Sequence, residues 1–159
     1  MKPRQVVALL ALVGVFVALY LTLYKVGIVG TLSCSIGSCE TVNTSRYAIF
    51  LGLPVAAWGL LTYVLLLALA LIGSREALDG SGAISWALLG LSGWSVLFSG
   101  WLTYLELFRI HAICIWCVTS ATLMLLIFVA SFVDWRRHVR RERTAPTDAD
   151  RSKWPVPSR

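Results

Sequence analysis

Four cysteines are the residues of this chain whose type and spacing could carry redox chemistry. Cys114 and Cys117 form a Cys-x-x-Cys pair at the start of the last long apolar stretch, and two sulfurs at this spacing can interconvert between dithiol and disulfide. The N-terminus of a helix stabilises a thiolate there, which lowers the pKa of the nearer cysteine. Cys34 and Cys39, the loop pair, follow the first apolar stretch and are separated by a flexible spacer. Together the two pairs predict thiol–disulfide exchange, which proceeds through mixed disulfides.

The elements that must position these cysteines are membrane helices. Apolar residues make up 58% of the 159 residues and the mean hydropathy is +0.78, values that indicate an integral membrane protein. Four stretches are long enough to cross the hydrocarbon. We therefore predict an all-α integral membrane protein, a four-transmembrane-helix bundle formed by residues 1–133, with spans at about 6–24, 54–72, 83–105 and 112–133.

Between the first two spans we expect an outer cysteine loop, residues 25–53, and after the last a charged tail. The polar run at residues 40–47 predicts a short extracytoplasmic cap helix lying at the membrane surface. Residues 134–159 are rich in arginine at first and in proline and aspartate later. We interpret them as a basic cytoplasmic tail and expect it to be disordered.

Basic residues predict the orientation of the spans. With four spans both termini lie on one side, and that side also carries Lys2, Arg4, Arg75 and the arginine-rich tail. The positive-inside rule therefore predicts a multi-pass protein of the cell (inner or cytoplasmic) membrane, with cytoplasmic termini and both cysteine pairs on the extracytoplasmic side, where disulfides can form. The net charge of +6 is explained by these topology signals and by contacts to the anionic lipid bilayer, so we expect no nucleic-acid partner.

Depth in the membrane distinguishes the two cysteines of the Cys-x-x-Cys pair. Cys117 lies about 4.5 Å deeper than Cys114 at the rise of an α-helix. We expect Cys117 to face a lipid-soluble electron acceptor and Cys114, at the rim, to exchange with the loop pair. Because Cys39 borders the cap helix, we expect it to pair with Cys114, which leaves Cys34 to meet an external substrate.

Short motifs accompany the cysteines, and the combined pattern resembles a known family. They are Ser45-Arg46-Tyr47-Ala48, Gly52-Leu53-Pro54 and Cys114-Ile115-Trp116-Cys117. With the loop pair they closely resemble the vitamin K epoxide reductase family, including its bacterial homologues. The resemblance covers about residues 6–133 and implies a four-helix bundle around a quinone (menaquinone or ubiquinone).

The resemblance also implies an electron relay and a partner. Electrons would pass from a thioredoxin-like dithiol protein to Cys34 and Cys39, then to Cys114 and Cys117, and then to the quinone. Ser45, with Arg46 beside it, matches the family residues that hold the loop and cap over the site. Many bacterial members carry a fused thioredoxin-like domain after the bundle. This chain has a short charged tail there instead, so we expect its partner to be a separate protein.

The chain departs from animal members of that family at two places. They have a tyrosine four residues after the second cysteine of the Cys-x-x-Cys pair, where this chain has Ala121. The start of the second span, residues 54–56, offers no asparagine to address an epoxide or quinone oxygen. Both differences favour quinone reduction over epoxide reduction.

Other polar and aromatic residues near the cysteines have two readings each. His111 is a candidate proton shuttle, although an interfacial histidine is often simply solvated. Trp116 is either an interface anchor or a residue that binds the quinone by stacking. Glu106 and Arg109 are either an exposed pair at a helix end or residues that touch a quinone oxygen or a partner. Hydroxyl side chains at helical spacing in the third span predict a close-packed face between helices; they are Ser92, Ser95, Ser99 and Thr103.

Alternatives to redox catalysis remain at this point. The four cysteines could bind zinc, although we expect no metal, or they could form a structural disulfide framework. Thiol–quinone oxidoreductases of the DsbB type also have four spans and two cysteine pairs, but their Cys-x-x-Cys pair comes first along the chain. A non-catalytic membrane assembly or transport subunit is the other class, and transport is disfavoured because no ionisable residue lies in the middle of a span.

Overall fold

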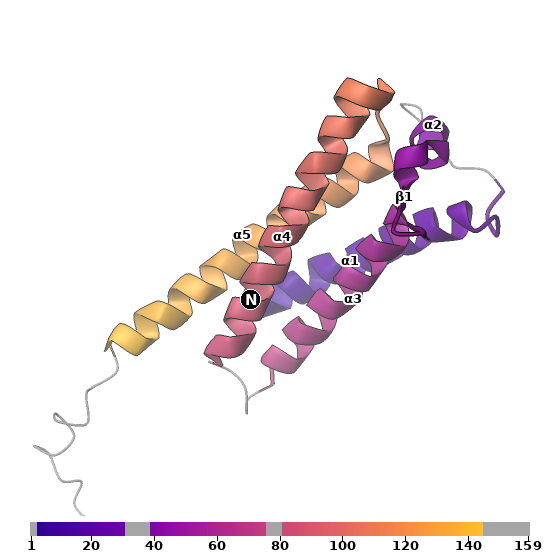
Figure 1. Ribbon diagram of the computed structural model, residues 1–159. Coiled ribbons are helices and arrows are strands. Elements are labelled where there is room, and N and C mark those ends of the chain that lie inside the picture. The colour runs from indigo at the N-terminus through magenta and orange to yellow at the C-terminus, as the bar shows by residue number, and fades with distance from the viewer. Residues whose placement is uncertain (1–2, 31–38, 76–80, 145–159) are drawn as a thin grey trace, which may run out of the picture.

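The computed structural model describes residues 3–30, 39–75 and 81–144, and its main elements are four long helices. These are α1 (Pro3–Lys25), α3 (Val55–Gly73), α4 (Gly82–Leu105) and α5 (Ile115–Thr144), and α4 continues into a π-helical turn, η3 (Glu106–Ile110). Each helix is long and apolar enough to cross a membrane. α1 and α4 run toward one end of the bundle and α3 and α5 run away from it (Figure 1). The predicted all-α bundle of four membrane helices is confirmed.

A small cap covers the end of the bundle where α5 begins (Figure 1). It consists of α2 (Cys39–Thr44), the 3-10 turn η1 (Arg46–Ala48) and a hairpin of β1 (Ile49–Phe50) and β2 (Leu53–Pro54). The hairpin turns through Leu51 and Gly52, whose φ angles of 52° and 81° are typical of a tight two-residue connection. The predicted cap helix exists, but it ends at Thr44 because the chain turns at Ser45 into η1.

The helices pack closely where α1 presents small residues to α3 and α5. Tyr63 of α3 is fully buried, and its ring lies so close to Gly14 that a Cβ there would come within 2.1 Å of it. The Tyr63 hydroxyl donates a hydrogen bond to the backbone carbonyl of Ser120 at 2.9 Å. This bond connects α3 to α5 through the centre of the bundle. A glycine at position 14 is therefore required by the close approach of the tyrosine ring.

At the end opposite the cap, a buried arginine connects all four helices. Arg4 of α1 is 4% exposed and its Nε donates to Asp134 Oδ2 of α5 at 3.1 Å. Its other donors bond the carbonyl of Gly73 at 2.6 Å, the carbonyl of Ser81 at 3.2 Å and Ser85 Oγ at 3.0 Å. We name these five residues the Arg4 cluster. Arg4, predicted as a topology signal alone, is thus also a structural residue.

The last helix is longer than predicted. α5 continues to Thr144, so residues 134–144 are helical where we predicted a disordered tail. Arginine is a good helix former, and neither proline nor glycine occurs between residues 134 and 144. Trp135 also packs against Trp86 of α4, with ring centroids 5.3 Å apart. Packing and helix propensity therefore carry α5 past the apolar stretch, and the rest of the predicted tail lies outside the described residues.

Candidate functional site

A cavity of about 380 Å³ lies beneath the cap, between the four long helices. Its volume falls within the range of about 300–1,000 Å³ that is typical of small-molecule sites. Most of the lining is apolar, with large aromatic side chains from α3 and α4 and a few polar groups near the cap. The aromatic side chains of these helices at the cavity are Trp58, Tyr63, Trp94 and Phe98.

The α4 hydroxyl residues divide between two environments. Ser92 is fully buried and its hydroxyl donates to the Leu88 carbonyl of its own helix, as expected for a packing face. Ser95, Ser99 and Thr103 instead line the cavity. The predicted close-packed face of α4 is therefore also one wall of the cavity.

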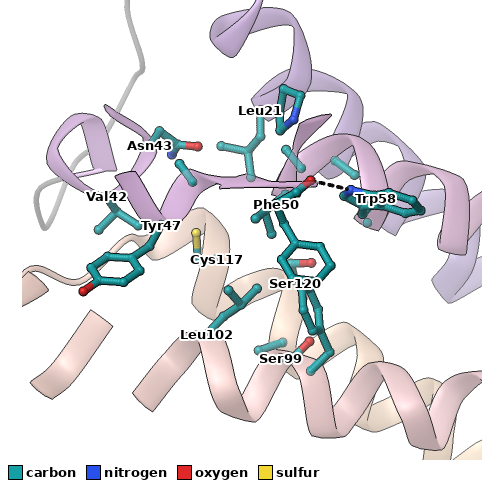
Figure 2. A pocket seen from close by; sticks show the side chains of 18 of the residues that line it. Leu21, Val42, Asn43, Tyr47, Phe50, Trp58, Ser99, Leu102, Cys117 and Ser120 are labelled. Carbon is teal, nitrogen blue, oxygen red and sulfur yellow. Dashed lines mark hydrogen bonds between the residues drawn. The ribbon is translucent and has the colours of Figure 1, made fainter. Parts of the chain in front are cut away.

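Of the described cysteines, Cys117 lines the cavity, and the helical period of α5 places it there. Residues 117, 121 and 124 are spaced by four and three positions, which puts them on one face of a helix, and all three line the cavity. Figure 2 shows the sulfur of Cys117 between α2, which carries Val42 and Asn43, and the side chain of Leu102 on α4. The sulfur of Cys117 therefore forms part of the cavity wall beneath the cap.

Cys114 occupies a different environment from Cys117. It is fully buried and packs in an apolar cluster with Cys39 and Val42 of α2. Asn43 Nδ2 lies 4.0 Å from Cys114 Sγ. Cys114 is not one of the described residues that line the cavity. One sulfur of the Cys-x-x-Cys pair thus contacts the cap and the other contacts the cavity.

The described cysteines are in two redox states. Cys39 is disulfide-bonded, whereas Cys114 and Cys117 are free thiols. Cys34 lies outside the described residues. A cysteine in a disulfide is not available as a zinc thiolate, so Cys39 does not support the zinc alternative in this state.

The surroundings of Cys114 favour its thiolate. A hydrogen bond from the Cys117 thiol lowers the pKa of Cys114, helped by the backbone N–H groups of Cys117 and Trp116 at the start of α5. Burial and the negative charge of Glu106 oppose this effect but do not reverse it. The sequence predicted a lowered pKa for the cysteine nearer the helix N-terminus, and the cysteine–cysteine hydrogen bond is an additional cause.

This hydrogen bond predicts how the reactivity of Cys114 depends on pH. A lowered pKa keeps Cys114 ionised to lower pH, so its alkylation by iodoacetamide should reach half its maximal rate below the value of about 8.5 for an ordinary cysteine. Replacing Cys117 by alanine removes the donor and should move this midpoint to higher pH. Mass spectrometry of the Cys114 peptide measures the rate, and Val118→Ala on the lipid-exposed side of α5 is the matched control. Equal midpoints in the wild type and Cys117→Ala would rule out the hydrogen bond as a cause.

The family to which the chain belongs follows from a match over most of its length. The model of the vitamin K epoxide reductase family matches residues 5–132, which include the four apolar spans and the cap. The chain belongs to the vitamin K epoxide reductase family. Members of this family are membrane thiol oxidoreductases that use quinones and act with thioredoxin-like partners.

The cavity fits the quinone that membership of the vitamin K epoxide reductase family implies. A quinone has a flat apolar ring with two carbonyl oxygens, and the cavity offers aromatic and aliphatic walls with few polar groups. Lys25 lies at the cap end, where its Nζ donates to the Asn43 carbonyl at 2.5 Å. Cys117 and Glu106 are also part of the lining. Aromatic side chains would hold the ring, and these polar groups lie where its reacting end would be.

Glu106 lies in the cavity wall rather than in an exposed pair with Arg109. From the sequence we favoured the exposed pair, with contact to a quinone oxygen as the alternative. Glu106 is only 6% exposed and lines the cavity, while Arg109 is exposed. The helical period of α4 places residue 106 there, because Ser99, Leu102 and Glu106 are spaced by three and four positions and all line the cavity. The signal available in the sequence was a single carboxylate inside an apolar run, Leu105-Glu106-Leu107-Phe108, eight residues before Cys114.

The remaining predicted site residues lie around the cavity rather than in its centre. Ser45 lines it, and its hydroxyl donates to the Val42 carbonyl at 2.7 Å, which holds the turn between α2 and η1. Arg46 is exposed and lies over the Tyr47 ring at 5.2 Å.

His111 is exposed in a left-handed conformation with φ of 54°. Trp116 packs against Tyr20, with ring centroids 5.1 Å apart. Neither His111 nor Trp116 is among the described residues that line the cavity.

Proposed function

We propose that this protein is a membrane thiol–quinone oxidoreductase that supports disulfide bond formation. It oxidises a thioredoxin-like dithiol protein outside the cytoplasm and passes the electrons to a membrane quinone. The observation that carries the proposal is the division of the Cys-x-x-Cys pair. Cys117 lines an apolar cavity, and Cys114 is buried against the disulfide-bonded Cys39 of the cap.

The division of the pair suggests a role for each cysteine. Cys117 delivers electrons to the acceptor in the cavity, and the quinone supplies a two-electron oxidant that is soluble in the membrane. Cys114, favoured as a thiolate, exchanges with Cys39 through a mixed disulfide. Cys34 exchanges with the external dithiol protein. Each thiol–disulfide exchange breaks one disulfide bond and forms another, and the last step forms the Cys114–Cys117 disulfide while two electrons and two protons go to the quinone. The dithiol of the partner therefore ends as a disulfide.

The proposed orientation follows from charge and from the placement of the cap. The arginines of residues 136–143 extend α5 at the end opposite Cys39 and Cys114, so the positive-inside rule favours a cytoplasmic location for that end. The cap and the cysteines then lie on the extracytoplasmic side of the cell membrane, where a secreted partner can reach them. Ser45 supports the cap over the cavity.

A cavity-filling substitution tests where the quinone binds. The protein should yield a quinone on solvent extraction, and it should oxidise a reduced thioredoxin-like protein when decylubiquinone is added. Replacing Ala121 by tryptophan fills the cavity one turn from Cys117 and should raise the KM for decylubiquinone about tenfold or more, a loss of about 1.4 kcal/mol of binding. The rate of oxidation at several quinone concentrations measures this change.

A tryptophan on the opposite side of the same helix is the matched control. Leu126 of α5 is half exposed and lies about 180° around the helix from Cys117, and Leu126→Trp should leave the KM within about twofold of the wild type. If both tryptophan variants have the KM of the wild type, the quinone does not bind in this cavity. If the wild-type protein neither contains a quinone nor shows quinone-dependent oxidation, the proposed function is wrong and a structural role for the disulfides is favoured.

A further inference from the structure

The carboxylate of Glu106 contacts both sulfur-bearing residues at the start of α5. Its Oε2 accepts a hydrogen bond from the backbone N–H of Cys114 at 3.4 Å. Its carboxylate also accepts a hydrogen bond from the thiol of Cys117. The same thiol can donate to Cys114. The single proton of Cys117 therefore lies within reach of two acceptors, a sulfur in the cap cluster and a carboxylate in the cavity.

No described cation neutralises Glu106 through an ion pair. The described ion pairs are Arg4–Asp134 at the far end of the bundle and His138–Glu142 on the extension of α5. Lys25 lines the same cavity, but its ammonium donates to the Asn43 carbonyl. A buried carboxylate without a cation is costly, and taking up a proton removes that cost. Glu106 is thus placed to take up a proton from the Cys117 thiol.

The other titratable groups at the cavity are less well placed to accept this proton. Tyr63 lines the cavity, but its hydroxyl bonds Ser120. Tyr47 also lines the cavity, from the cap. His111, the proton shuttle suggested by the sequence, is exposed and absent from the described lining. Among the described residues, Glu106 alone combines a hydrogen bond to the Cys117 thiol with a place in the cavity wall.

We infer that Glu106 is a catalytic residue that takes the proton of Cys117 and passes it into the cavity. The inference rests on the proposed function. Oxidation of the pair forms the Cys114–Cys117 bond, sends two electrons to the quinone and releases the Cys117 proton, while Cys114 reacts as the thiolate. Glu106 accepts that proton and then releases it toward the reduced quinone, which needs two protons. The second is the proton that Cys114 gave up when it ionised, so atoms and charge balance.

Infrared spectroscopy tests the hydrogen bond without quinone or turnover. In a quinone-depleted Cys114→Ala protein with its loop pair oxidised, the S–H stretching band belongs to Cys117, and Glu106 is its remaining acceptor. A charged acceptor makes a stronger hydrogen bond than a neutral one. Adding Glu106→Gln should therefore move the band to higher wavenumber, whereas adding Glu142→Gln, which changes an exposed carboxylate, should leave it in place. An unmoved band in the Glu106→Gln protein would overturn the inference.

Turnover with decylubiquinone supplies the second measurement. Glu106→Gln should lower kcat about 100-fold or more, the usual size of a general acid–base contribution, with a KM close to that of the wild type. Glu106→Asp keeps a carboxylate and should retain more activity than the glutamine variant, which also covers the case in which Glu106→Gln folds poorly. A wild-type rate in Glu106→Gln overturns the inference but leaves the proposed function intact. An inactive wild type overturns both.

Discussion

Replacing Cys117 by alanine is expected to reduce quinone-dependent oxidation to background, a loss of about 1,000-fold or more. Cys117 is the sulfur that lines the cavity, and removing one member of a group that reacts as a unit costs nearly all of its rate. Oxidation of a reduced thioredoxin-like protein in the presence of decylubiquinone measures the loss. Cys114 remains in this variant, but it contacts the cap rather than the cavity.

The same variant should trap the exchange between the cap and α5. With Cys117 absent, the Cys114 thiolate can attack the disulfide of Cys39, which forms a Cys39–Cys114 bond and leaves the former partner of Cys39 as a thiol. Mass mapping of non-reduced peptides should identify this bond. Cys114→Ala is the matched control, and no bond between Cys39 and Cys117 should form in it. A dominant Cys34–Cys114 bond in the Cys117→Ala protein would contradict the proposed order of exchange.

The sequence predicted the arrangement of the cysteines because that arrangement depends on simple periodic features. Long apolar runs determine where helices cross the membrane, and the rise of a helix determines that Cys117 lies deeper than Cys114. In the structure Cys114 packs in one cluster with Cys39, and Cys117 lines the cavity. The roles of the cysteines remain predictions that the variants above test.

The burial of Glu106 depends on tertiary packing. Its face follows from the helical period of α4, because Ser95, Ser99, Thr103 and Glu106 are spaced by four, four and three positions and all line the cavity. Its burial could not be predicted in this way, because the cap that covers this end of the bundle is distant in the chain. Trp116 had two readings from the sequence, and its ring packs on Tyr20 of α1. Whether a side chain on a given helical face is buried is decided by neighbours far away in the chain.

Breaking the buried ion pair of the Arg4 cluster is expected to be the most destabilising single change on the far side of the bundle. In Asp134→Leu, Arg4 stays buried without the carboxylate that its Nε bonds at 3.1 Å. Ser85 Oγ also loses its acceptor, which lies 2.7 Å away. Removing one partner of such a pair typically costs about 3–5 kcal/mol. The change in the free energy of unfolding is measured on the detergent-solubilised protein, with unfolding monitored as the loss of the helical circular dichroism signal.

The ion pair and the charge of Arg4 can be separated by a double variant. If the cost in Asp134→Leu arises from an unpaired buried guanidinium, then Arg4→Met combined with Asp134→Leu should recover most of the lost stability, because no charge remains buried. Glu142→Gln is the control. It removes the contact between Glu142, whose side chain is 67% exposed, and His138, and it should change the free energy of unfolding by about 0.5 kcal/mol or less. A double variant as unstable as Asp134→Leu would show that the hydrogen bonds of Arg4 to Gly73 and Ser81, rather than its pairing with Asp134, hold the helices together.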